Sequence, residues 1–103
     1  MYVRLVPIKL KPGVARDDPR VKVWQPLFAA LEQECGGIVR LESGWNTTDR
    51  PIARDCGIDK GFATRAGPDA YGPHPTHQDL AAKLRHFADW VICDYEPGEW
   101  VSN

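Results

Sequence analysis

The chain has 103 residues, enough for one domain spanning residues 1–103 and too few to divide into two. Its composition, 43% hydrophobic and 26% charged, is that of a folded globular protein, and no apolar run approaches the roughly 20 residues of a membrane span. The net charge of −1 gives no overall field that would attract nucleic acid or an anionic membrane, so we expect neither as a partner.

The first half of the chain predicts a strand, a helix and a second strand. Residues 2–10 alternate in character and stop at a Pro-Gly pair, which is typical of a strand. A helix is expected over residues 25–35, or from residues 18–19 with a kink at Pro26, because apolar residues recur there at helical spacing. Residues 37–43 alternate again and predict the second strand.

The second half has a long irregular stretch before a helix and a last strand. Residues 44–75 are dominated by turn-forming residues, and only residues 61–65 offer a short third strand. A helix capped by Thr76 is expected next, with an apolar stripe formed by Leu80, Leu84, Phe87 and Ala88. Residues 90–96 are largely hydrophobic, stop at another Pro-Gly pair and predict the final strand.

This order of elements predicts an α+β ferredoxin-like fold (βαββαβ), an antiparallel sheet with both helices on one face. The last strand would lie beside the first, which would bring the basic start of the chain, including Arg4, against the acidic residues after position 87. The opposite face of the sheet would have no helix over it, and a second copy of the chain is the simplest cover. We therefore expect a homodimer.

The segment PHPTHQDL (73–80) carries two histidines at the start of the second predicted helix. If Thr76 caps this helix, His77 lies at its first position, where the positive helix end favours a neutral imidazole that can act as a general base. A metal site on His74 and His77 would need a third ligand, and no spacing enforces one, so we predict no metal. A purely structural alternative is that both imidazoles only bond nearby backbone.

The tryptophans and the cysteines allow two further predictions. Trp24 and Trp90 are expected in the core, whereas Trp100, beyond the last strand, is in a position to reach a partner subunit. The three cysteines lack the C-x2-C spacing of a zinc or redox motif, which predicts reduced thiols and a cytoplasmic protein.

Five segments in order along the chain resemble the stress-responsive dimeric α/β-barrel (Dabb) family: IKLKPGV (8–14), GWN (44–46), DKGF (59–62), AYGPHPTHQDL (70–80) and WVICDYEP (90–97). The resemblance implies a ferredoxin-like subunit that dimerises through its sheet into a dimeric α/β barrel, with a cavity between sheet and helices. In this family's plant polyketide cyclases, of the olivetolic acid cyclase type, the second histidine of His-Pro-x-His is the general base and a preceding tyrosine assists. Those positions match His77 and Tyr71. Two departures are Arg4, where many members have a histidine, and a short segment over residues 63–73.

The resemblance implies a cofactor-free aldol cyclase or lyase acting on a poly-β-keto or similar small apolar substrate. His77 would remove a proton alpha to a carbonyl, and Tyr71 would hydrogen-bond the developing enolate. We assign substrate binding to His74, Arg4, Trp45 and Phe62. The alternatives are a zinc protein and a non-catalytic, stress-responsive dimer that binds a small apolar ligand or a protein through Trp45 or Trp100.

Overall fold

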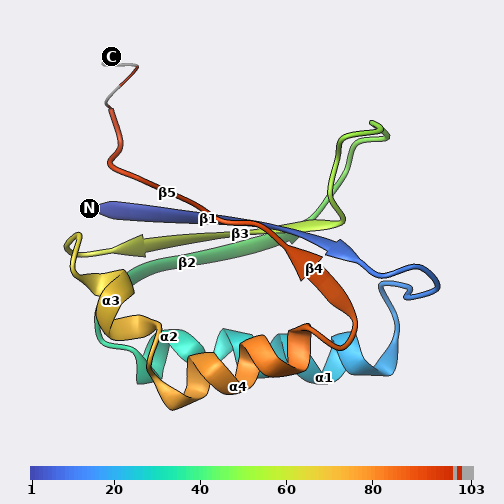
Figure 1. Ribbon diagram of the computed structural model, residues 1–103, viewed down its shortest axis with the longest axis horizontal. Coiled ribbons are helices and arrows are strands. Elements are labelled where there is room, and N and C mark those ends of the chain that lie inside the picture. Colours follow the sequence, from blue (N-terminus) through green and yellow to red (C-terminus); the bar gives the residue numbers. More distant parts are fainter. Residues whose placement is uncertain (99, 101–103) are drawn as a thin grey trace.

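The sheet is built around β1 (Tyr2–Leu10), which pairs with strands on both of its edges. In the computed structural model, which describes residues 1–98 and 100 apart from the side chains of residues 32 and 33, β3 (Cys56–Phe62) runs antiparallel along one edge. β4 (Ala88–Trp90) and β5 (Cys93–Tyr95) follow one another along the other edge. β2 (Ile38–Trp45) lies outside β3, so the strand order is β2-β3-β1-β4 with every pairing antiparallel (Figure 1).

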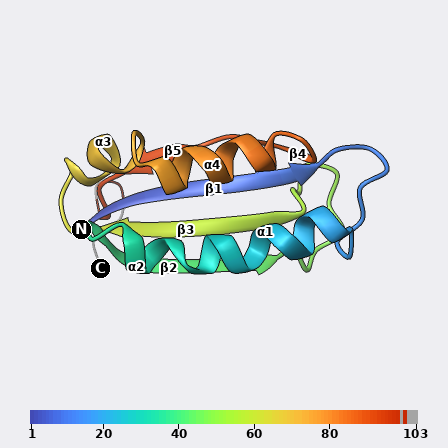
Figure 2. The ribbon, with the colours of Figure 1, turned by 90° about the horizontal axis from the view of Figure 1, so that it is seen from below.

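The helices lie on one face of this sheet (Figure 2). α1 (Pro19–Ala29) and α2 (Leu31–Glu34) run along the β2–β3 side, and α4 (Pro75–Leu84) runs along the side of β1 and its other neighbours. α3 (Gly67–Tyr71) is a short helix between β3 and α4. The predicted ferredoxin-like fold is therefore confirmed, with two short helices added. Within the described residues, none of the helices has both the length and the apolar character needed to span a bilayer.

The first helix differs from the predicted range 25–35. α1 begins at Pro19, after Asp18, whose carboxylate accepts a hydrogen bond from the Arg20 backbone N–H at 2.9 Å, so the earlier of the two predicted starts is correct. Pro26 lies inside the helix and removes one N–H from its hydrogen-bond ladder. The helix ends one turn later, and the short α2 takes up the rest of the predicted range.

The predicted third strand, residues 61–65, is wrong in position, because β3 covers Cys56–Phe62. The Gly, Asp and Lys residues of this segment have low strand propensity, so its composition gives little sign of a strand. Every second side chain from Ile58 is nevertheless buried, and Ile58, Lys60 and Phe62 all lie on the face toward the helices.

The predicted last strand, residues 90–96, is two short strands, β4 and β5, in one continuous register along β1. The gap between them lies opposite Pro7. A proline has no N–H to donate, so the ladder is interrupted there, although the Val91 N–H still reaches the Pro7 carbonyl at 3.3 Å.

The core fills the space between the sheet and the helices. Trp24 is buried there, as predicted, and its Nε1 donates to the Leu80 carbonyl at 2.9 Å, which joins α1 to α4. Trp90 is only partly buried at the edge of the core, so that expectation holds in part, whereas Trp100 is 97% exposed. The largest fully buried side chains of the described residues are Phe62, Ile8 and Leu31 in this core and Val3 outside it.

Candidate functional site

The start of α4 is capped by His74 rather than by Thr76, which corrects the predicted cap. The His74 Nδ1 accepts a hydrogen bond from the Thr76 backbone N–H at 3.2 Å, and the helix begins at Pro75. The Thr76 hydroxyl instead donates to the Glu34 carboxylate, which ties α4 to α2. His74 thus has a structural role at the helix start, and His77 lies within the first turn of α4.

His77 is held in one orientation beside Tyr71. Its Nδ1 lies 3.2 Å from the Gly72 carbonyl oxygen, so a neutral ring carries its hydrogen on Nδ1 and leaves Nε2 able to accept a proton. The His77 and Tyr71 ring centroids are 4.1 Å apart, with the rings tilted by 49°. Burial lowers the pKa of His77, and the Lys60 and Arg4 charges lower it further. The predicted neutral form is therefore favoured, chiefly by burial.

Tyr71 is fixed at the end of α3 by the core behind it. Its side chain is 3% exposed, and the Phe62 ring meets it edge-on at 5.5 Å. Burial raises the pKa of the Tyr71 phenol above its ordinary value, which keeps the hydroxyl protonated as a hydrogen-bond donor. Phe62 is completely buried and supports Tyr71 from the core side, so it does not line the cavity.

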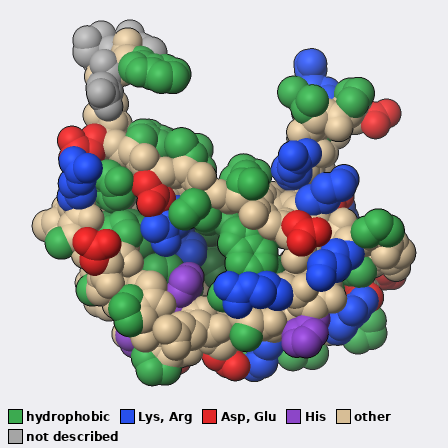
Figure 3. All heavy atoms as spheres, in the orientation of Figure 1, with side chains coloured by type: hydrophobic (Ala, Val, Ile, Leu, Met, Phe, Trp, Pro, Cys, Tyr) green, Lys and Arg blue, Asp and Glu red, His purple; other side chains and the backbone are tan. Residues whose placement is uncertain are grey.

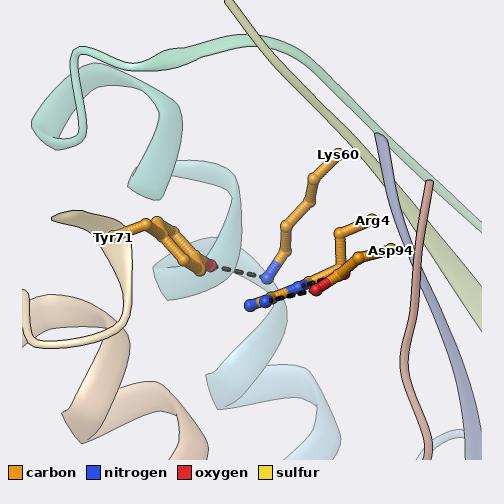
Figure 4. Close-up of polar contacts among 4 residues, drawn as sticks. All are labelled: Arg4, Lys60, Tyr71 and Asp94. Atoms are coloured by element: carbon orange, nitrogen blue, oxygen red, sulfur yellow. Dashed lines mark hydrogen bonds and ion pairs between the residues drawn. The ribbon is translucent and has the colours of Figure 1, made fainter. Parts of the chain in front are cut away.

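Arg4 and Asp94 form the cross-strand pair that the charge pattern predicts. The two residues are directly opposite in β1 and β5, and the guanidinium donates two hydrogen bonds to the carboxylate at 2.7 and 2.9 Å (Figure 4). These bonds raise the pKa of Arg4 and lower the pKa of Asp94. Asp94 therefore neutralises Arg4 and fixes its direction.

Lys60 is the site residue that the sequence reasoning missed. It is 5% exposed, and its ammonium donates to the Tyr71 hydroxyl oxygen at 2.6 Å (Figure 4). Burial and the nearby Arg4 charge lower the pKa of Lys60 to about 8. A signal was present, because a period of two in IDKGF (58–62) puts Lys60 on the face shared by the apolar Ile58 and Phe62.

These polar groups converge on a cavity of about 200 Å³ between the sheet and the helices. Arg4, Lys60, Tyr71 and His77 line it, and its apolar wall is formed by Val6, Phe28, Ile58, Leu80 and Leu84. Figure 3 shows a histidine and basic side chains gathered in the hollow between the sheet and the helices. The cavity thus combines apolar surface with a few polar groups, as small-molecule sites do.

Trp45 lies away from this cavity. It lines a second hollow of about 450 Å³ beside β2 and β3, and the Arg16 guanidinium covers its ring at 4.9 Å. Of the six residues assigned from the sequence, the structure brings together His77, Tyr71 and Arg4, and leaves His74, Phe62 and Trp45 outside the cavity. Across the described part of the chain, no group of three or more His, Cys, Asp or Glu side chains is arranged to hold a metal ion.

Replacing Lys60 with methionine is expected to raise the free energy of unfolding by about 2 kcal/mol at pH 7, because it removes a buried charge at the loss of one hydrogen bond. In the wild type, stability should rise from pH 8 toward pH 10, since unfolded Lys60 keeps a proton that the folded protein has released. Lys60→Met should flatten this rise. Urea unfolding across this range measures both effects.

The exposed Lys22 supplies the matched control for that measurement. Lys22→Met should leave both the stability at pH 7 and its rise with pH as in the wild type. A Lys60→Met protein less stable than the wild type at pH 7 would contradict the assignment of an uncompensated charge.

Comparison with known proteins gives one close relative and many proteins of the same fold. SCO4036 of Streptomyces coelicolor, described as an uncharacterized protein, is 42% identical over 96 residues that cover 93% of this chain and 99% of that protein. No protein-family model matches the chain.

Two solved structures illustrate the fold. A Dabb family protein from Mesorhizobium loti is 17% identical, with a TM-score of 0.73 over 93% of this chain and 96% of that one. A hydroxynitrile lyase from Passiflora edulis is 13% identical, with a TM-score of 0.75 over 91% of both chains. Several others are described as dimeric ferredoxin-like proteins of unknown function. These low identities show a shared fold, whereas the identity to SCO4036 over nearly the whole length shows that the chain belongs to the same family as that Streptomyces protein.

Proposed function

We propose that this protein is a cofactor-free lyase or cyclase of the Dabb type, which uses His77 as a general base on a small carbonyl substrate. One observation carries the proposal: His77 and Tyr71 lie side by side in one cavity, with the His77 Nδ1 held by the Gly72 carbonyl. A backbone bond to one ring nitrogen orients the imidazole and leaves the other nitrogen free for proton transfer. Bonds to both nitrogens would have favoured a structural role.

The proposed reaction begins with proton transfer from carbon. His77 Nε2 takes a proton from the carbon alpha to a carbonyl, and the negative charge that develops passes to the carbonyl oxygen. The Tyr71 phenol, kept protonated by burial, donates a hydrogen bond to that oxygen. Lys60 donates to the phenol oxygen from the other side, which leaves the phenol hydrogen free to point at the substrate. The resulting carbanion can add to a second carbonyl, as in an aldol closure, or expel a leaving group.

The cavity supports a small and largely apolar substrate. Its volume of about 200 Å³ is below the range of drug-sized sites, and aliphatic and aromatic side chains form most of its wall. A short polyketide-like chain with two neighbouring carbonyls matches this shape and also has the acidic carbon that a histidine can deprotonate. The Passiflora structure of the same fold is a lyase by its description, which agrees with this class of chemistry.

We further propose that the protein is a homodimer in the cytoplasm, joined through the helix-free face of the sheet. That face bears the small residues Gly44 and Gly57 next to Leu5 and Pro7, so a second sheet can approach it closely. Several proteins of the same fold are described as dimeric, and Cys35, Cys56 and Cys93 are free thiols, as suits a reducing compartment. A molar mass in solution near 11.6 kDa, that of one chain, would contradict the dimer.

The function is tested by α-proton exchange, which does not require the natural substrate. The protein is mixed in D2O with small β-keto esters and aryl methyl ketones, and proton NMR follows the replacement of α-hydrogens by deuterium. A functional site should accelerate exchange in a saturable manner for the compounds that fit the cavity. If none of these carbon acids exchanges faster than in buffer, the proposed chemistry is excluded for them.

A non-catalytic, stress-responsive binding protein is the second candidate, and the hollow beside Trp45 favours it. That hollow, at about 450 Å³, is larger than the His77 cavity and contains neither His77 nor Tyr71. A small apolar ligand that binds there without being changed, with tryptophan fluorescence as the readout, would support this function instead.

A further inference from the structure

Lys60 differs from Arg4, which lines the same cavity, because no described carboxylate pairs with Lys60. Asp94 on β5 is occupied by both hydrogen bonds from Arg4, and the described partner of Lys60 is the neutral phenol of Tyr71. The charged or titratable groups that act on Lys60 are Arg4, Tyr71, His77, Asp94 and Cys35. A lysine that is desolvated beside another cation holds its proton weakly, and its unprotonated amine is a nucleophile.

The surroundings of Lys60 also suit covalent chemistry. Its amine lines a cavity whose wall is mostly apolar, and the Tyr71 hydroxyl lies 2.6 Å from its nitrogen. Tyr71 in turn contacts His77, so one phenol bridges the amine and the imidazole. A carbonyl carbon attacked by Lys60 would therefore have an acid next to its oxygen and a base near its α-carbon.

We propose that Lys60 forms an iminium ion with a small ketone or β-diketone in this cavity. The nitrogen lone pair attacks the carbonyl carbon, a C–N bond forms, and the carbonyl π electrons move to oxygen, which receives a proton from nitrogen. Tyr71 then protonates the hydroxyl, the C–O bond breaks, water leaves, and the nitrogen lone pair forms C=N. The sum is one amine, one ketone and one proton giving one iminium ion and one water, with the Tyr71 proton restored from solvent.

The iminium ion would extend the proposed function. It withdraws electrons from the α-carbon more strongly than a ketone does, so His77 would remove the α-proton more easily. The proposal rests on the proposed function in that both put a carbonyl compound in this cavity. Imine formation nevertheless requires no turnover, and the two ideas can fail separately.

Pentane-2,4-dione is a suitable probe, because its imine rearranges to a stable enaminone without a reductant. The wild-type protein is incubated with the probe at pH 8, and intact mass and peptide mapping locate the adduct. We expect a mass increase of one diketone less one water on Lys60, formed at least tenfold faster than on the exposed lysines. The rate should rise as the pH passes through about 8.

Three variants make the test specific. Lys60→Met and Lys60→Arg should both lose the fast adduct. Lys60→Arg keeps the positive charge but has no nucleophilic amine. Lys22→Met should be labelled at Lys60 at the wild-type rate. Lys60 left unmodified while exposed lysines react would overturn the proposal. The proposal would also be overturned if a carboxylate ligand bound the wild type and Lys60→Arg with equal affinity and neither protein formed an adduct. Lys60 would then contribute only its positive charge. Labelling without α-proton exchange would refute the proposed function alone, and exchange without labelling would refute the iminium ion alone.

Discussion

Replacing His77 with glutamine is expected to lower the rate of catalysed α-proton exchange by about 10²- to 10⁴-fold, the range that general-base catalysis contributes. Glutamine is close to histidine in size and can keep the hydrogen bond to the Gly72 carbonyl, but it cannot accept a proton near neutral pH. The loss should appear in the rate at saturating ligand, while ligand affinity changes little. Proton NMR in D2O measures both quantities.

The pH profile gives an independent check on the same residue. Burial lowers the pKa of His77, so the imidazole is already unprotonated at pH 7. The wild-type exchange rate should therefore not fall as the pH is lowered from 7 until the pH is below the ordinary histidine pKa. His86 is the matched control, since it is exposed and lies outside the cavity. His86→Gln should exchange at the wild-type rate, and a His77→Gln protein that also did so would remove the proposed base.

The sequence was most informative where local geometry follows directly from residue type. The segment PHPTH predicts the start of a helix with one imidazole in its first turn. The structure has α4 beginning there, with His77 in the first turn. The prediction of the cap was wrong by two positions, because the His74 ring nitrogen accepts from the Thr76 N–H, whereas a Thr76 cap would have accepted from an N–H further along the helix. Thr76 was available for Glu34 only because α2 lies close to α4, which is a tertiary contact that no local pattern contains.

Two of the residues assigned to substrate binding lie outside the His77 cavity for a related reason. Phe62 and Trp45 are aromatic, and aromatic side chains are as common in cores as in ligand sites. Only the position of β3 decides that Phe62 faces the core behind Tyr71, and the predicted strand over residues 61–65 left that position open. The same shift hid Lys60, because a period of two places its side chain beside Ile58 and Phe62 only once the segment is recognised as a strand.

Arg4 and Lys60, two of the basic residues that line the cavity, differ in their effect on stability because they have different partners. Arg4 is compensated by Asp94 through two hydrogen bonds, whereas Lys60 has only a neutral phenol. A buried charge without a counter-charge lowers stability, and groups of this kind concentrate at functional sites. The expected stabilisation by Lys60→Met and the expected loss of chemistry by the same substitution therefore have one cause.

Replacing Phe62 with alanine is expected to lower the free energy of unfolding by about 3–5 kcal/mol, the range for removing a buried aromatic ring from a core. Phe62 is completely buried, and its ring packs between Tyr71 and Gly67. The Tyr71 ring meets it edge-on, and Gly67 approaches so closely that a Cβ there would lie 2.7 Å from Phe62 Cδ1. A cavity at this position would thus loosen α3, the helix that carries Tyr71. Urea unfolding followed by tryptophan fluorescence measures the change.

Leu27→Ala is the control for this measurement, because it removes apolar atoms from a residue outside the core. It lies on α1, is 38% exposed and is absent from the core, so Leu27→Ala should change the stability by no more than about 0.5 kcal/mol. A loss below about 1 kcal/mol for Phe62→Ala would contradict the core position of Phe62. In that event the ring would be free to contact a ligand, as the sequence first suggested, and Phe62→Ala would weaken ligand binding instead of folding.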